Sequence, residues 1–128
     1  MGLLLKSKKI LPNLVLSSPA NRAITTARMV CQAINYPLTK IEIRNELYDT
    51  SFQKVLNTIE LVNSTIDVLM IFGHNEWITE MVNYLSPTPI ENIATCGVVA
   101  LKCHINDWFE LDYSTIDLLF YEKPLKSE

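Results

Sequence analysis

The sequence contains little glycine and no cysteine motif, and both shortages exclude common kinds of site. Three glycines among 128 residues allow neither a GxGxxG dinucleotide loop nor a P-loop. The cysteines, Cys31, Cys96 and Cys103, form no CxxC pair, and none has an arginine six positions later, as a cysteine phosphatase requires. No cluster of histidine and cysteine has metal-ligand spacing, so we expect neither a metal nor a cofactor. The cysteines are expected to be small core residues in a reducing compartment.

Long apolar runs and basic clusters are also missing. The longest apolar runs, residues 68–72 and 98–101, are far shorter than the ~18 residues of a membrane span. The net charge is −3, and the largest basic cluster is Lys6, Lys8 and Lys9. We therefore expect neither nucleic acid nor a membrane as partner. The cytoplasm is the expected location, because lysines follow the first leucines rather than precede them, unlike in a signal peptide.

What is present favours one α/β domain over residues 1–128. The composition, 48% hydrophobic and 20% charged, is that of an ordinary globular domain. Short apolar runs alternate with amphipathic stretches, as in layered α/β folds. Strands are expected at residues 13–17, 41–44, 67–73, 96–105 and 116–121, and the third should be the most buried. Helices are expected from residue 18 to about 34, around 52–59 and at about 76–85.

The first strand-to-helix junction, residues 16–23, contains a candidate anion site. Ser18 is the expected N-cap of the helix, with Pro19 at its first position. Arg22 lies in the first turn, so its guanidinium can reach back over the strand end and join the free N–H groups of the helix. An isolated arginine in a first turn is, however, more often a solvated side chain. The apolar stripe of this helix is expected to be Ala23, Ala27, Val30 and Ile34.

The second junction follows the strand at 67–73. That strand ends at Gly73, and His74 should lie at the same sheet edge as Arg22, where α/β proteins bind ligands. A histidine there can donate to phosphate oxygens and, when protonated, stabilise their charge. The alternative is a capping or packing histidine. Glu76 is better explained by the helix dipole than by acid catalysis, and His104 is expected to be a surface residue.

Four segments together resemble the histidine phosphatase superfamily, most closely its SixA-type phosphohistidine phosphatases. In chain order they are Ser17-Ser18-Pro19-Ala20-Asn21-Arg22-Ala23-Ile24-Thr25-Thr26-Ala27, Glu46-Leu47-Tyr48, Gly73-His74-Asn75 and Thr95-Cys96-Gly97-Val98. The resemblance extends from about residue 13 to residue 121.

This resemblance implies a three-layer α/β/α, phosphoglycerate-mutase-like fold with a mostly parallel sheet. It implies a hydrolase of signal transduction that takes phosphate from a phosphohistidine-bearing protein or a small phosphorylated substrate, without a cofactor. By the same resemblance, Arg22 and His74 would be catalytic. Arg22, His74 and Asn75 would bind the phosphoryl group, and Ser18 would support Arg22 by capping its helix.

The sequence departs from the family at the nucleophile. The family places its nucleophilic histidine in an Arg-His-Gly motif after the first, central strand, whereas His74 follows Gly73 and His104 follows Cys103. We therefore expect these 128 residues to lack that central strand and to be inactive on their own. A non-catalytic phosphohistidine-binding pseudophosphatase is the alternative, and a flavodoxin-like interaction domain is a third. Open strand edges next to the missing strand predict a homodimer or aggregation.

Overall fold

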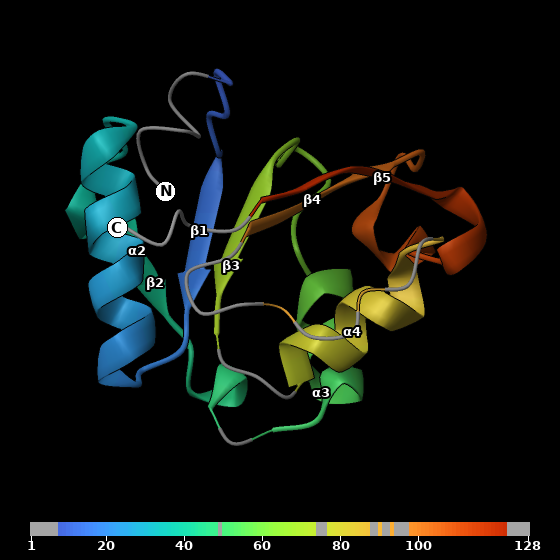
Figure 1. Cartoon of the computed structure of the whole chain (residues 1–128), viewed down its shortest axis with the longest axis horizontal. Helices are drawn as coiled ribbons and strands as arrows, with labels where there is room; N and C mark the ends of the chain where they lie inside the picture. The colour runs from blue at the N-terminus through green and yellow to red at the C-terminus, as the bar shows by residue number, and fades with distance from the viewer. Residues whose placement is uncertain are drawn as a thin grey trace. The chain divides into compact units, whose positions relative to one another are not determined.

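The structure, a computed structural model, describes residues 8–48, 50–73, 77–87, 90, 93 and 98–122. Strands and helices alternate along the chain, as Figure 1 shows. They are β1 (Leu14–Ser17), α2 (Asn21–Ala33), β2 (Glu42–Ile43), α3 (Phe52–Glu60), β3 (Leu69–Phe72), α4 (Trp77–Leu85), β4 (Val98–Cys103) and β5 (Ile116–Glu122). The predicted α/β class is confirmed, and each observed element lies within two or three residues of its predicted place.

The chain divides into two compact units, each made from separate stretches of sequence. One unit comprises Met1–Thr50 and Thr65–His74, and the other comprises Ser51–Ser64 and Asn75–Glu128. The first contains β1, α2, β2 and β3, and the second contains α3, α4, β4 and β5. That all 128 residues form one domain stays a prediction.

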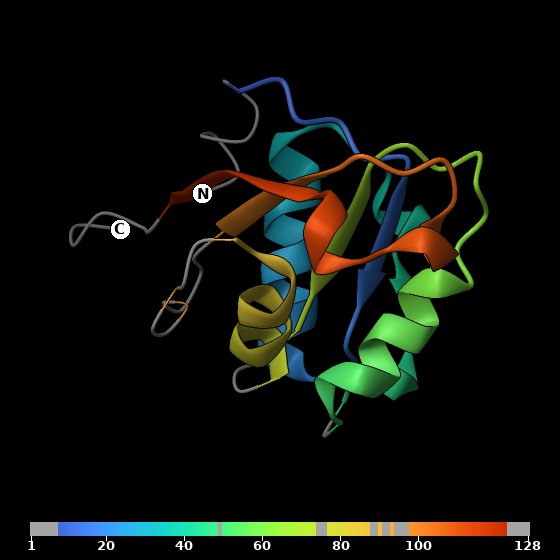
Figure 2. The same ribbon diagram turned by 90° about the vertical axis from the view of Figure 1, so that its right-hand side faces the viewer.

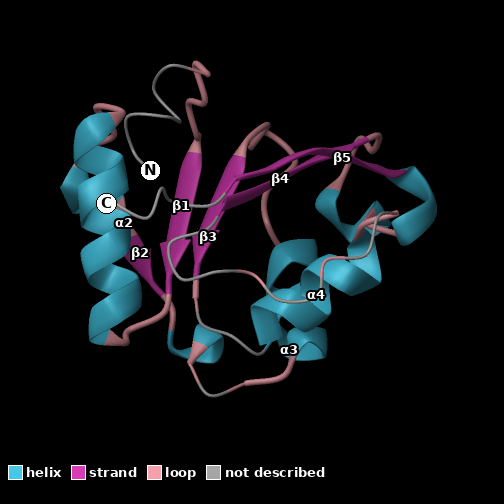
Figure 3. Ribbon diagram, viewed as in Figure 1, coloured by secondary structure: helices cyan, strands magenta, loops and turns pink. Residues whose placement is uncertain are grey.

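The sheet of the first unit is parallel, with strand order β2-β1-β3 (Figure 3). β1 pairs with β3 from Leu14↔Leu69 to Ser17↔Phe72. The side chain of Asn13 fixes the start of this ladder, because its Oδ1 accepts hydrogen bonds from the backbone N–H groups of Asp67 (3.1 Å) and Val68 (2.9 Å). The expectation that β3 is the most buried strand is wrong. β1 is the more buried because it has a strand on both sides, whereas β3 pairs with one strand among the described residues.

Helix α2 packs on β1 and β3, beside which it runs in both Figure 1 and Figure 2. Its predicted stripe of Ala23, Ala27, Val30 and Ile34 is buried, and Cys31 is buried with it. Burial raises the pKa of the Cys31 thiol, which keeps it protonated, as expected of a small core residue.

The predicted start of α2 is wrong. The helix begins at Asn21 with Ala20 in the N-cap position, so Ser18 does not cap it and Pro19 is not its first residue. The reason is a long-range hydrogen bond: the N–H of Ser18 donates to the carbonyl of Phe72 (2.9 Å) and extends the β1–β3 ladder past the end of the strand. Ser18 is thereby held in the sheet, and the helix starts after it.

In the second unit, α3 and α4 pack together and β4 pairs antiparallel with β5. The rings of Phe52 and Tyr84 contact each other, with centroids 5.4 Å apart. A buried cluster of Val82, Ile90 and Ile93 lies under partly buried apolar side chains from α4, β4 and β5, namely Ile78, Val99 and Tyr121. Among the described residues, none of the helices combines the length and apolar character that crossing a bilayer would need.

Candidate functional site

The carboxyl ends of the three parallel strands place two connecting segments at one edge of the sheet. β1 leads through Ser18 and Pro19 into α2, and β2 leads through Arg44 into a short 3₁₀ helix, Asn45–Leu47. A hydrogen bond from the N–H of Arg44 to the carbonyl of Ser17 (2.9 Å) ties the two segments together. This is the edge at which parallel α/β sheets form ligand sites.

The first turn of α2 is suited to a negative charge. The N–H of Ile24 donates to the carbonyl of Ala20 (3.0 Å), which leaves the N–H groups of Asn21, Arg22 and Ala23 without an acceptor inside the helix. Within the described residues, no side chain caps this end, and the first turn contains no acidic residue. No acidic side chain in the first turn therefore neutralises the positive end of the helix dipole.

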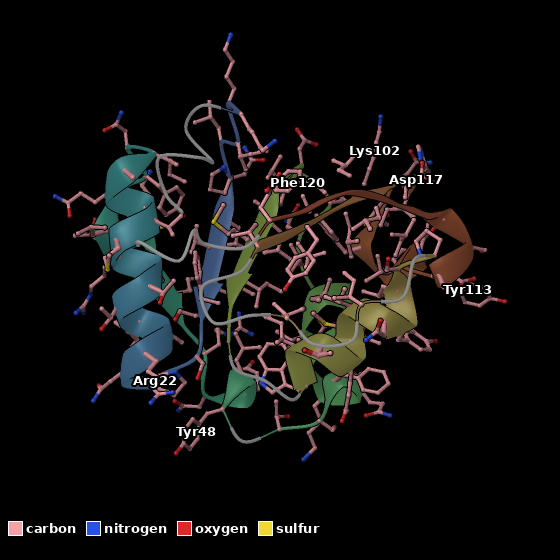
Figure 4. All side chains as sticks on the ribbon, viewed as in Figure 1. Arg22, Tyr48, Lys102, Tyr113, Asp117 and Phe120 are labelled. Carbon is pink, nitrogen blue, oxygen red and sulfur yellow. The ribbon has the colours of Figure 1, made fainter. Side chains whose placement is uncertain are left out.

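An open depression of about 440 Å³ lies beside this turn, lined by Pro19, Ala20, Asn21 and Tyr48. Arg22 and Tyr48 both project at this end of the sheet, as Figure 4 shows. Both side chains are exposed. The depression is thus bordered by the N-terminus of α2 and the ring of Tyr48, and Arg22 is the next residue of the helix after the lining residue Asn21.

Arg22 and Arg44 differ in their partners. Arg44 forms an ion pair with Glu46 (2.8 Å) and another with Glu42 (3.6 Å). The hydrogen bond to Glu46 raises the pKa of Arg44, and the same bond lowers the pKa of the Glu46 carboxyl. Arg22 has no carboxylate partner among the residues that the structure describes. Two carboxylates compensate the charge of Arg44, so Arg22 is the better placed of the two to receive an anion.

The two serines before α2 shape the turn rather than cap the helix. Both are fully buried. The hydroxyl of Ser17 donates to the carbonyl of Ser18 (2.9 Å), and the hydroxyl of Ser18 accepts from the N–H of Ala20 (3.3 Å). The predicted role of Ser18 as a helix cap is therefore wrong. Ser18 instead fixes the path of the chain from β1 into α2, and so the position of the first helical turn that contains Arg22.

The structure brings together only part of the predicted site. Arg22 lies at the expected sheet edge, but His74, Asn75 and Glu76 lie outside the described residues, as do residues 94–97. Their roles stay predictions. Sequence reasoning gave Tyr48 and Arg44 no role. The spacing of Glu42 and Arg44 was a signal for their ion pair, because residues two apart in an extended segment share a face. Glu46 reaches Arg44 from the 3₁₀ helix instead.

Comparison with known proteins adds the fold to this description. No protein-family model matches the sequence, and a search of curated proteins also finds no match. Among solved structures, the protein histidine phosphatase SixA complexed with tungstate has a TM-score of 0.75 at 21% identity, over 94% of this chain and 74% of that one. The chain has the SixA fold.

Two further SixA structures also match the fold of this chain. The SixA protein of Agrobacterium tumefaciens has a TM-score of 0.77 at 20% identity, over 96% of this chain and 75% of that one. The SixA protein of Nakamurella multipartitia has a TM-score of 0.71 at 17% identity, over 97% of this chain and 80% of that one. The fold that the sequence resemblance implied is therefore confirmed.

Proposed function

We propose that this chain belongs to a phosphohistidine phosphatase and binds the phosphoryl group of a phosphohistidine at the N-terminus of α2. We further propose that these 128 residues alone bind it without hydrolysing it. The observation that carries the proposal is the placement of Arg22. It stands in the first turn of an uncapped helix whose first residue, Asn21, lines an open depression, at the edge formed by the carboxyl ends of the parallel strands.

The chemistry of the site fits a phosphoryl group. A guanidinium binds two phosphate oxygens at once through parallel N–H donors, and such charge-assisted bonds are about twice as strong as neutral ones. The free N–H groups of the first turn of α2 add donors to the same anion. One SixA neighbour was solved with tungstate, a tetrahedral oxyanion like phosphate, which supports an oxyanion site in this fold. We assign His74 and Asn75 to the remaining oxygens.

The lack of turnover follows from the histidines. A covalent route needs a positioned nucleophile, and His74 cannot both attack the phosphorus and stabilise the oxygens of the group it attacks. The other histidine, His104, directly follows β4, and its Nε2 contacts Oδ2 of Asp117 on β5 (2.7 Å). Neither follows an arginine. Within these 128 residues, the lack of a histidine that follows an arginine favours a second candidate function, a pseudophosphatase that recognises phosphohistidine without hydrolysing it.

The binding claim is tested by calorimetric titration of the 128-residue chain with tungstate and with a peptide that carries phosphohistidine. We expect Arg22→Ala to lower the affinity for both ligands by at least ~10-fold, since a hydrogen bond to a charged group contributes about 1.5–3 kcal/mol. Arg28→Ala is the matched control, because Arg28 is an exposed arginine of the same helix about 9 Å further along its axis. Equal affinity in the wild type and Arg22→Ala would overturn the proposal.

A phosphate-release assay on the same peptide tests the second part. We expect release at the rate of the buffer alone. Release that needs the chain and disappears in Arg22→Ala would show that a nucleophile is present and would reject the non-catalytic account. The intact mass of the protein isolated from its own cell distinguishes the two candidate functions. A mass above that of these 128 residues favours the phosphatase, and an equal mass favours the pseudophosphatase.

A further inference from the structure

Asn21 belongs both to the first turn of α2 and to the depression beside it. It is the first residue of the helix, so its backbone N–H is one of the donors that have no acceptor inside the helix, and it also lines the depression. Its side chain is exposed, and no hydrogen bond joins that side chain to another of the residues that the structure describes. The amide therefore offers one acceptor oxygen and two N–H donors beside the proposed phosphoryl site.

The lining of the depression suits a flat, uncharged group. Its volume of about 440 Å³ lies within the range of roughly 300–1,000 Å³ for sites that hold small organic ligands. Among the described residues that line it, Pro19 and Tyr48 contribute rings, and none is charged. Besides the Tyr48 hydroxyl, Asn21 has the one polar side chain of these lining residues. A ring with a single polar atom on its edge matches this lining.

We propose that the depression holds the imidazole ring of the bound phosphohistidine, and that the amide of Asn21 hydrogen-bonds the ring nitrogen that carries no phosphoryl group. This inference rests on the proposed function, which places the phosphoryl group on the N–H groups of the same turn. Because the ring is bonded directly to the phosphoryl group, it must lie next to that turn. The depression adjoins the turn at Asn21, which makes Asn21 the residue that recognises the ring.

An amide suits this ring nitrogen whether or not the nitrogen has a proton. The Nδ2 group of Asn21 donates to a bare nitrogen, and Oδ1 accepts from a protonated one. Phosphotyrosine also has a flat ring, but only carbon atoms lie where the second nitrogen would be, and phosphoserine has no ring at all. Asn21 should therefore favour phosphohistidine over other phosphorylated side chains.

Calorimetric titration of Asn21→Leu with three ligands tests this role. The ligands are tungstate, a peptide with phosphohistidine and the same peptide with phosphotyrosine. We expect the affinity for the phosphohistidine peptide to fall about 3- to 10-fold, as for the loss of one hydrogen bond, and the other two affinities to change little. Leucine keeps the size of asparagine and favours helix more strongly, and Ala20 rather than Asn21 occupies the N-cap position, so the variant should leave α2 intact.

Gln32→Leu is the matched control, because Gln32 is an exposed amide of the same helix about 16 Å further along its axis. It should change none of the three affinities. An unchanged affinity for the phosphohistidine peptide in Asn21→Leu, or equal losses for the two peptides, would overturn this inference. The proposed function would still stand if Arg22→Ala lowers the affinity for tungstate. Unchanged tungstate binding in Arg22→Ala would instead overturn the proposed function, and this inference with it.

Discussion

At the scale of single residues, the ion pair between Arg44 and Glu46 makes stability depend on pH. Arg44 lowers the pKa of the Glu46 carboxyl through a hydrogen bond, so the folded value lies below the unfolded one. The stabilisation is therefore present above the unfolded pKa and is lost as the pH falls through the folded pKa. Both side chains are more than a third exposed, so water screens the pair and its contribution to stability should be below about 1 kcal/mol.

Thermal unfolding of the wild type and Glu46→Gln measures this contribution. We expect the wild type to be slightly more stable at neutral pH and the difference to disappear as the pH falls through the lowered folded pKa of the Glu46 carboxyl. High salt at neutral pH should also reduce it, because exposed pairs are screened. A difference that persists unchanged in acid would mean that the Glu46 side chain acts through packing rather than through charge.

Tyr48 should help to distinguish phosphohistidine from free phosphate. Its ring is exposed beside the first turn of α2 and lines the same depression. A neutral ring adds little to the binding of a bare anion but offers a flat apolar surface to an imidazole. We expect Tyr48→Ala to weaken binding of the phosphohistidine peptide several-fold and to change tungstate binding little. Tyr48→Phe, which keeps the ring, should change the affinity for neither ligand. Equal losses for both ligands in Tyr48→Ala would contradict this role.

At the scale of elements, local patterns predicted the interior of each element better than its ends. The stripe of α2 and the helix α3 follow from spacing alone, because a helix repeats every 3.6 residues whatever its partners. The start of α2 depends on a bond between Ser18 and Phe72, which lie far apart in the sequence. The local sequence around Ser18 cannot predict a bond to such a distant residue. Ser18 and Pro19, a pair that commonly starts a helix, therefore predicted a start that is too early.

The burial of β3 was mispredicted for a similar reason. An apolar run shows that a strand is suited to a buried place, but its exposure depends on which strands lie beside it. β1 has two neighbours because β2 and β3, from later in the chain, both pair with it. The strand order follows from contacts across the chain, which the composition of β3 does not contain.

The residues of the candidate site also differ in whether local sequence could predict them. Arg22 was predictable, since its strand-to-helix junction fixes where a first-turn side chain lies. Tyr48 was not, because it reaches the depression from the end of the 3₁₀ helix Asn45–Leu47, more than twenty residues later in the sequence than Arg22. Leu47 beside it is fully buried and anchors this segment.

At the scale of the whole molecule, the likeness to the SixA structures extends over 94–97% of the chain and so includes residues of both compact units. The matches at 17–21% identity establish a fold, and a fold can host more than one activity. The functional claim therefore rests on the edge of the parallel sheet, where the first turn of α2, which contains Arg22, begins beside the open depression.

Backbone amide NMR of the 128-residue chain during a tungstate titration tests that claim most directly. If the anion binds where we propose, the largest saturable shifts should fall on the amides of Asn21, Arg22 and Ala23, and the amide of Arg28 should stay nearly unchanged. The same titration of Arg22→Ala should leave these shifts small and unsaturated. Saturable shifts centred elsewhere, or none at the start of α2, would contradict the account.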